Sequence, residues 1–148
     1  MLTRRVFLAT GLAALVAGPA RAQTPQVFQR GGYAINGYDP VAYFRAGAPV
    51  RGAGDLSVQW QGATWLFSSD ANKAAFAANP DSFAPQYGGY CSYAVSRGYT
   101  AKTEPDAWKV VNGRLYLNYS VQVRRLWSRD IPGNIRRANE NWPRVLNA

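Results

Sequence analysis

The sequence predicts an α+β fold, a small single domain with two β-hairpins, each followed by a helix, plus a C-terminal helical segment. Two stretches of alternating apolar and polar residues, each with a turn dipeptide at its centre, predict the hairpins. A potential N-cap residue follows each stretch and precedes a helical pattern. The chain has 148 residues, 14% of them aromatic, which predicts one modest, aromatic-rich core.

The first 22 residues are predicted to be an export signal. Arg4-Arg5 precedes an apolar run that is too short to cross a bilayer as a helix. Ala20 and Ala22 are small residues at the two positions that a signal peptidase recognises, which predicts cleavage before Gln23. The arginine pair resembles the twin-arginine type of signal. We therefore expect a periplasmic or secreted protein that does not span a membrane after cleavage.

Residues 23–32 show no periodicity and are predicted to form a flexible arm before a domain at 33–148. The domain is expected to begin with a short helix, with Asp39 as its N-cap, Pro40 at its first position and Gly47 after its end. The apolar side chains expected to face the core from this helix are Val41, Tyr43 and Phe44.

The two hairpins are predicted at residues 56–67 and 108–119, and each leads into a helix. Their turn dipeptides are Gln61-Gly62 and Asn112-Gly113, and the expected helix N-caps are Ser69 or Asp70 and Ser120. A shift of 51 residues places Gly62 on Gly113, Trp65 on Tyr116, Leu66 on Leu117, Ser69 on Ser120 and Phe76 on Trp127. Either one hairpin-helix unit is used twice, or two ordinary hairpins share an ordinary spacing.

Two more helical segments are expected outside these units. Gly88-Gly89 allow unusual backbone conformations, and residues 90–96 after them are predicted to form a short helix with Cys91 in its first turn. A last helix is predicted to start near Pro132 and to be interrupted by Pro143.

Positive charge is concentrated near the C-terminus. Without Arg4, Arg5 and Arg21 the chain keeps 14 basic and 8 acidic residues, a net charge of +6. The expected basic surface consists of Arg124, Arg125, Arg129, Arg136 and Arg137, with Arg144 beyond it. Such a surface is either a solvated helix face or a site for an anionic surface, polymer or acidic protein. Nucleic acid is not an expected partner of an exported protein.

The residues available for chemistry are few. The chain has one cysteine, so no intramolecular disulfide can form, and no histidine, so the commonest general base and metal ligand is missing. The only methionine, Met1, belongs to the predicted signal.

Three stretches resemble the YHS-domain family, specifically its small exported members: NGYDPVAYF at 36–44, the hairpin-helix region 65–83 and YGGYCSYAVSRG at 87–98. The resemblance implies a compact α+β module. In the wider family such modules accompany heavy-metal transport ATPases and some oxygenases, so the family suggests copper or another heavy metal as a cofactor.

This chain departs from the metal-associated pattern of that family. Metal-associated members place a cysteine after Asp-Pro-Val and two more at the hairpin-helix junction, where this chain has Ala42, Ser68 and Asn72. Copper(I) and zinc need thiolate or imidazole ligands that these side chains do not provide. A metal site of the family's kind is therefore not expected here.

The candidate ligand or redox residues are Cys91, Tyr87, Tyr90 and Asp39. Cys91 has three possible roles: a nucleophile whose pKa Arg97 would lower, a redox or metal-binding thiol, or a small apolar side chain packed in the core. The absence of histidine excludes a cysteine-histidine dyad.

The candidate aromatic pocket consists of Trp60, Trp65, Tyr93 and Tyr99. It would hold a flat or apolar ligand, including a haem with a tyrosinate or thiolate ligand, or the same rings would serve as core packing. The function expected from these observations is an exported YHS-like binding or accessory module, whose partner is a small molecule, a metal or another exported protein. The alternative is a thiol- or metal-dependent redox protein or enzyme that uses Cys91.

Overall fold

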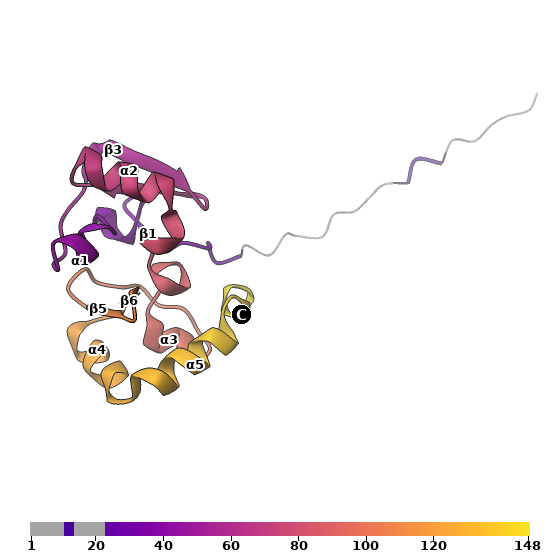
Figure 1. Cartoon of the computed structure of the whole chain (residues 1–148). Helices are drawn as coiled ribbons and strands as arrows, with labels where there is room; N and C mark the ends of the chain where they lie inside the picture. Colours follow the sequence, from indigo (N-terminus) through magenta and orange to yellow (C-terminus); the bar gives the residue numbers. More distant parts are fainter. Residues whose placement is uncertain (1–10, 14–22) are drawn as a thin grey trace, which may run out of the picture.

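The computed structural model describes residues 11–13 and 23–148 (Figure 1). The predicted export signal, residues 1–22, lies outside the described residues except for 11–13. The strands are β1 (Gln29–Arg30), β2 (Tyr33–Ala34), β3 (Ala53–Trp60), β4 (Ala63–Phe67), β5 (Trp108–Val111) and β6 (Arg114–Leu117). The α-helices are α1 (Ala42–Arg45), α2 (Asp70–Ala78), α3 (Ser92–Ser96), α4 (Val121–Trp127) and α5 (Ile131–Asn141). The predicted α+β fold is confirmed.

The strands pair in three antiparallel hairpins, β1-β2, β3-β4 and β5-β6. The second and third are the two predicted hairpins. Gln61 and Gly62 have φ of 50° and 73°, and Asn112 and Gly113 have φ of 51° and 75°. Two successive residues with positive φ are typical of the tight turn whose twist matches that of the flanking strands.

A serine begins the helix that follows each predicted hairpin. The side chain of Ser69 accepts a hydrogen bond from the Asn72 backbone N–H over 3.1 Å, and that of Ser120 accepts one from the Val123 N–H over 3.1 Å. The helix predicted to start at Pro40 with Asp39 as N-cap begins two residues later in the structure, at Ala42 with Val41 as its N-cap, and has only four residues. The Asp39 carboxylate instead accepts the N–H groups of Val41 and Ala42 from the turn before α1.

The two hairpin-helix units are alike in geometry, which favours one unit used twice. The rings of Trp65 and Phe76 have centroids 5.2 Å apart and planes inclined by 34°. The equivalent rings of Tyr116 and Trp127 lie 5.3 Å apart at 36°. Each pair joins a hairpin strand to the helix that follows, so the same packing closes both units.

The likeness extends to the loop before each unit. Three consecutive residues, Ile35, Asn36 and Gly37, have φ of 42°, 61° and 77°, and 52 positions later Tyr87, Gly88 and Gly89 have φ of 58°, 63° and 83°. Such left-handed runs are rare because a Cβ atom crowds the following carbonyl. A single turn of this kind followed by a tyrosine therefore marks the start of both units.

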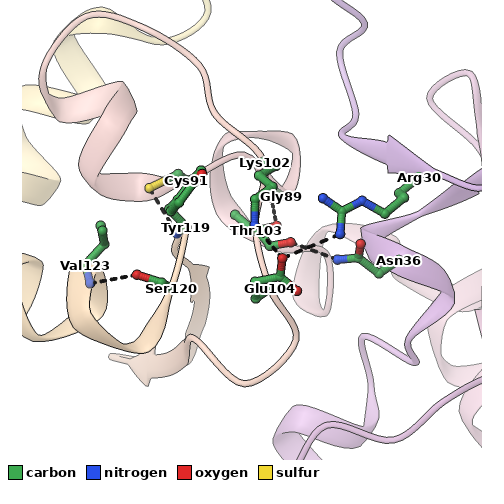
Figure 2. Close-up of polar contacts among 10 residues, drawn as sticks. All are labelled: Arg30, Asn36, Gly89, Cys91, Lys102, Thr103, Glu104, Tyr119, Ser120 and Val123. Atoms are coloured by element: carbon green, nitrogen blue, oxygen red, sulfur yellow. Dashed lines mark hydrogen bonds and ion pairs between the residues drawn. The ribbon is translucent and has the colours of Figure 1, made fainter.

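Thr103 connects the two left-handed turns (Figure 2). Its backbone oxygen accepts a hydrogen bond from Asn36 Nδ2 over 2.9 Å, and its hydroxyl donates to the Gly89 oxygen over 2.8 Å. Next to it, Glu104 pairs with both Lys102 and Arg30. The segment between α3 and β5 thus holds the two units together.

Two apolar clusters form the core, and strand β6 lies between them. Leu115 and Leu117 point into the first cluster, with Trp65 and Phe76, whereas Tyr116 points into the second, with Trp127. This follows from the alternation of side chains along a strand. In Figure 1 the β3-β4 hairpin and α2 lie at one end of the molecule and α3, α4 and α5 at the other, with β5 and β6 between them.

Residues 23–32, for which the sequence predicts an arm, are packed against the domain in the structure. Val27 and Phe28 are 1% and 8% exposed and enter the first and second clusters, respectively. The Phe28 N–H donates to the Gly88 oxygen over 2.9 Å, and β1 pairs with β2. A two-residue strand is too short to show a period, and the contact of Phe28 with Gly88 joins segments far apart in the chain.

The C-terminal helix is confirmed with small shifts. Asp130 caps α5 by accepting the Gly133 N–H over 3.0 Å, Pro132 lies in its first turn, and the helix ends before Pro143. Within residues 11–13 and 23–148, no helix is long and apolar enough to cross a membrane.

Candidate functional site

A cleft of 380 Å³ lies between the first unit and the segments of the second. Its aromatic lining comes from Trp60 and Trp65 on the β3-β4 hairpin, Tyr87 in the second left-handed turn, and Trp142 after α5. Its volume is near the lower end of the range of about 300–1,000 Å³ found for small-molecule sites. Four aromatic side chains from three parts of the chain therefore meet at one ligand-sized hollow.

The aromatic side chains are held by contacts with one another and with Asn139, which also lines the cleft. The indole N–H of Trp65 donates to the Trp60 oxygen over 3.0 Å, and the two rings lie 5.8 Å apart. The Tyr87 hydroxyl donates to Asn139 Oδ1 over 2.9 Å, and its ring lies 6.1 Å from that of Trp142. Because these contacts fix the rings, the cleft walls are preformed.

Gly88 forms part of the cleft lining at a point where the chain approaches itself closely. A Cβ atom on Gly88 would lie 1.9 Å from the Gln26 backbone oxygen and 3.3 Å from the Trp142 ring. Only glycine fits here, both for space and for its φ of 63°.

Opposite charges lie at the mouth of the cleft. Asp81, after α2, and Arg114, at the start of β6, both line it, and both are exposed. Among the described residues neither takes part in an ion pair within 4.0 Å. Arg114 is thus a free cation for an acidic ligand group, and Asp81 is a free acceptor.

The structure brings together part of the predicted aromatic pocket. Trp60 and Trp65 line the cleft, but Tyr93 and Tyr99 do not. Tyr93 packs at the edge of the second cluster, and its hydroxyl accepts a hydrogen bond from Arg97 over 2.9 Å. Tyr99 is 53% exposed. Two of the four predicted rings therefore line the cleft and two do not.

Asp39 is fully buried and has no free oxygen for a ligand. Its Oδ1 accepts the backbone N–H groups of Val41 and Ala42 over 2.8 and 3.3 Å. Its Oδ2 accepts the Ser68 N–H over 2.8 Å, the Ser68 hydroxyl over 2.7 Å and Asn72 Nδ2 over 2.8 Å. Ala42 in α1, Ser68 after β4 and Asn72 in α2 thus meet around this carboxylate.

Cys91 is 1% exposed and is the N-cap of α3, one position before the helix rather than within its first turn. Its Sγ accepts the N–H group of Tyr119 over 3.2 Å (Figure 2). It also accepts the Ala94 N–H over 3.5 Å, and the thiol donates to Asn118 Oδ1 over 3.7 Å. Burial raises the pKa of the thiol, and the backbone hydrogen bonds only partly oppose this. The environment therefore disfavours a thiolate.

The candidate tyrosines belong to separate networks from Cys91. The Tyr90 hydroxyl donates to the Pro25 oxygen over 2.7 Å, and the Tyr87 hydroxyl is bound to Asn139. Burial raises the pKa of both phenols above the ordinary value of 10.0. A tyrosinate, and with it a tyrosinate-bound haem, is disfavoured at neutral pH.

The arginines of the predicted basic surface lie in two separate groups in the structure. Arg124, Arg125 and Arg129 line a hollow of 670 Å³ between α4 and β5, together with Lys109. Arg136 and Arg137 do not line it, and Arg137 pairs with Asp130 over 3.5 Å.

Trp142, Arg114, Asp81 and Lys109 are the site residues that the sequence interpretation missed. Each is brought into place by contacts between distant segments, and no local pattern marks any of them. Among the described residues, no three His, Cys, Asp or Glu side chains lie together as in a metal site.

Fold and site together define a class: an α+β module of two similar loop-hairpin-helix units with a preformed aromatic cleft between them. Comparison with protein-family models, with curated proteins and with solved structures found no match for this chain.

Proposed function

We propose that this chain is an exported, YHS-like binding module that holds a small flat molecule with an acidic group in the cleft between its two units. The observation that carries the proposal is a ligand-sized hollow lined by the partly exposed rings of Trp60 and Trp142, backed by the buried rings of Trp65 and Tyr87, with one free arginine. Planar ligands stack on such rings, and a guanidinium binds a carboxylate or phosphate through paired hydrogen bonds.

Two further observations support the family and compartment in this proposal. Ala42, Ser68 and Asn72 stand where the resemblance expects three metal-binding cysteines. All three residues contact Asp39, as the ligands of a single metal site would lie close together. Export rests on the sequence at Arg4-Arg5 and Ala20-Arg21-Ala22. An export route for folded proteins would be consistent with a cofactor loaded before secretion.

The geometry favours binding over catalysis by Cys91. The thiol is buried, its pKa is raised, and its polar neighbours are backbone N–H groups and an asparagine rather than a base. Among the described residues, the cleft lining holds no cysteine, serine, threonine or lysine, and its one carboxylate, Asp81, is exposed.

Native mass spectrometry of protein exported from its own host tests the proposal. We expect a bound small molecule, and we expect Trp60→Ala with Arg114→Gln to lose it while the fold, followed by circular dichroism, is kept. Tyr99→Ala, which removes an exposed ring outside the cleft, is the matched control and should keep the ligand.

In a second arm, purified protein is titrated with indole-3-acetate, an aromatic carboxylate, and tryptophan fluorescence is recorded. Saturable binding that weakens in the cleft variant supports the cleft as the site. Binding that is equal in the cleft variant and in Tyr99→Ala would contradict it.

A further inference from the structure

The hollow between α4 and β5 is a second site, separate from the aromatic cleft. Seven residues line it, and four of them are cations: Lys109, Arg124, Arg125 and Arg129. The other three are Trp108, Val110 and Ser128, so no carboxylate lines the hollow. The aromatic cleft shares none of these seven residues.

These four cations have no ion-pair partner, as is true of most basic residues in 23–148, but they differ from the others in lining one hollow together. Within residues 23–148, the cations in ion pairs shorter than 4.0 Å are Arg30, Lys102 and Arg137. Asp130 follows Arg129 in the chain, but its two oxygens are engaged by the Gly133 N–H and by Arg137. Four positive charges therefore face one hollow without internal compensation.

The arrangement is more than the charged face of a helix. Arginines in the last turn of α4 are favoured by the helix dipole alone, which would account for Arg124 and Arg125. Lys109 comes from β5 on the other side of the hollow, and Arg129 comes from the short turn after α4. Cations from three elements therefore converge on one hollow, and a bound anion would reduce the repulsion between their like charges.

The rest of the lining indicates the size and kind of anion. Trp108 is held by its contact with the Tyr43 ring, 5.3 Å away, and forms a fixed wall. The Ser128 hydroxyl donates to the Arg124 oxygen over 2.7 Å, so the remaining donors are the charged groups themselves. Arginine forks match the oxygens of phosphate, and four cations match a ligand with three or four negative charges.

We propose that this hollow, defined by Lys109, Arg124, Arg125 and Arg129, binds a soluble compound with at least two linked phosphate groups. Pyrophosphate is the simplest molecule with this chemistry and serves as the probe. The proposal is independent of the aromatic cleft, because the two sites share no residue.

The test is calorimetric titration of the exported protein with pyrophosphate at about 0.15 M salt, where weak surface electrostatics are screened. We expect saturable binding at one site. Arg125→Gln with Arg129→Gln should weaken it by about tenfold for each arginine, the effect of losing a hydrogen bond to a charged group. Lys109→Gln should also weaken pyrophosphate binding. If the arginines of α4 were only a solvated helix face, this change in β5 would have no such effect.

The matched control is Arg136→Gln with Arg144→Gln, which removes the same charge from exposed positions outside the hollow. It should change affinity by no more than about twofold. Equal weakening in the two double variants would overturn the proposal, because it would show a response to net charge alone. Absence of saturable pyrophosphate binding to the native protein would also overturn it.

A vesicle arm separates a soluble phosphate compound from a lipid surface. Vesicles of phosphatidylcholine with phosphatidylglycerol present single phosphates on a membrane. If these vesicles bind the protein and pyrophosphate does not displace them, the site serves a membrane and the proposal fails. Displacement by pyrophosphate, lost in the Arg125→Gln, Arg129→Gln variant, supports it. Unchanged thermal unfolding of each variant shows that folding is not the cause.

Discussion

The thiol of Cys91 occupies the same place in the second unit as the carboxylate of Asp39 in the first. Each is preceded by a left-handed turn and a tyrosine, and each accepts a backbone N–H at the start of a short helix, that of Ala42 for Asp39 and that of Ala94 for Cys91. Asp39 also accepts the N–H of Ser68 just after β4, and Cys91 that of Tyr119 just after β6. The role of the lone cysteine is thus that of a structural hydrogen-bond acceptor, in a place where its counterpart is an acid.

Removal of the Asp39 carboxylate should strongly destabilise the fold. Asp39→Ala leaves the N–H groups of Val41 and Ser68 without their partner in a buried place, and we expect a loss of about 3 kcal/mol in the free energy of unfolding. Urea unfolding measures it. Asp55→Ala, at an exposed position in β3, should change stability by less than about 0.5 kcal/mol. Similar small effects for both would show that the Asp39 network is not important for the fold.

Cys91 should react slowly with a thiol reagent such as dithionitrobenzoate in the folded protein and fast in urea. The reasons are its burial and its raised pKa, which keeps the thiol protonated at neutral pH. Cys91→Ala should cost about 1 kcal/mol through lost packing. Rapid stoichiometric labelling of folded protein would instead indicate a reactive thiolate and make the redox interpretation the better one.

The elements that the sequence predicts well are those with local signals. Ser69 and Ser120 cap helices by hydrogen bonds to residues three positions later, and Gly113 forms a turn between adjacent strands. Because these contacts are local, the sequence pattern predicts them correctly. The cleft depends on contacts that cross the chain, such as that of Trp142 with Tyr87, and no short pattern encodes those. Gly37-Tyr38-Asp39 aligns with Gly89-Tyr90-Cys91 at a shift of 52 residues, whereas the hairpins align at a shift of 51. Because the two shifts differ, a search at a single shift does not detect this part of the repeat.

Gly113→Val should destabilise the β5-β6 hairpin by about 1 kcal/mol or more. Gly113 has a φ of 75°, which a β-branched residue resists, and nothing lies within 4 Å of a Cβ atom there, so the cost is conformational. Gly54→Val is the control, because it has equal space and no positive φ. Thermal unfolding compares the two variants, and an equal midpoint for Gly113→Val and native protein would contradict the turn assignment.

Stability should fall as the pH rises above about 10, partly through buried phenols. Burial raises the pKa of Tyr43 and Tyr87 above the ordinary value of 10.0, so the native state keeps protons that the unfolded state releases. Their stabilising contribution is present below that ordinary value and is lost as the pH rises toward the folded pKa.

Tyr87→Phe should therefore lose less stability than native protein between about pH 8 and about pH 11. For each protein, the change in the urea midpoint between the two pH values is measured. The variant lacks the hydrogen bond to Asn139 at both pH values, so comparison of these changes isolates the effect of phenol ionisation. Tyr99→Phe, which removes an exposed phenol, is the control. A steeper alkaline loss in Tyr87→Phe than in native protein would show that the sign is wrong.

Purified protein should have no tight intramolecular site for copper or zinc. Ala42, Ser68 and Asn72 stand where the resemblance expects thiolates, and the two oxygens of Asp39 between them already accept five hydrogen bonds. A metal ion at this place would have to displace those donors and would find only weak oxygen ligands for a soft cation. Calorimetric titration with each metal should show only weak binding, because the one thiol, Cys91, is buried. A stoichiometric site of sub-micromolar affinity in monomeric protein that survives Cys91→Ser would refute the prediction.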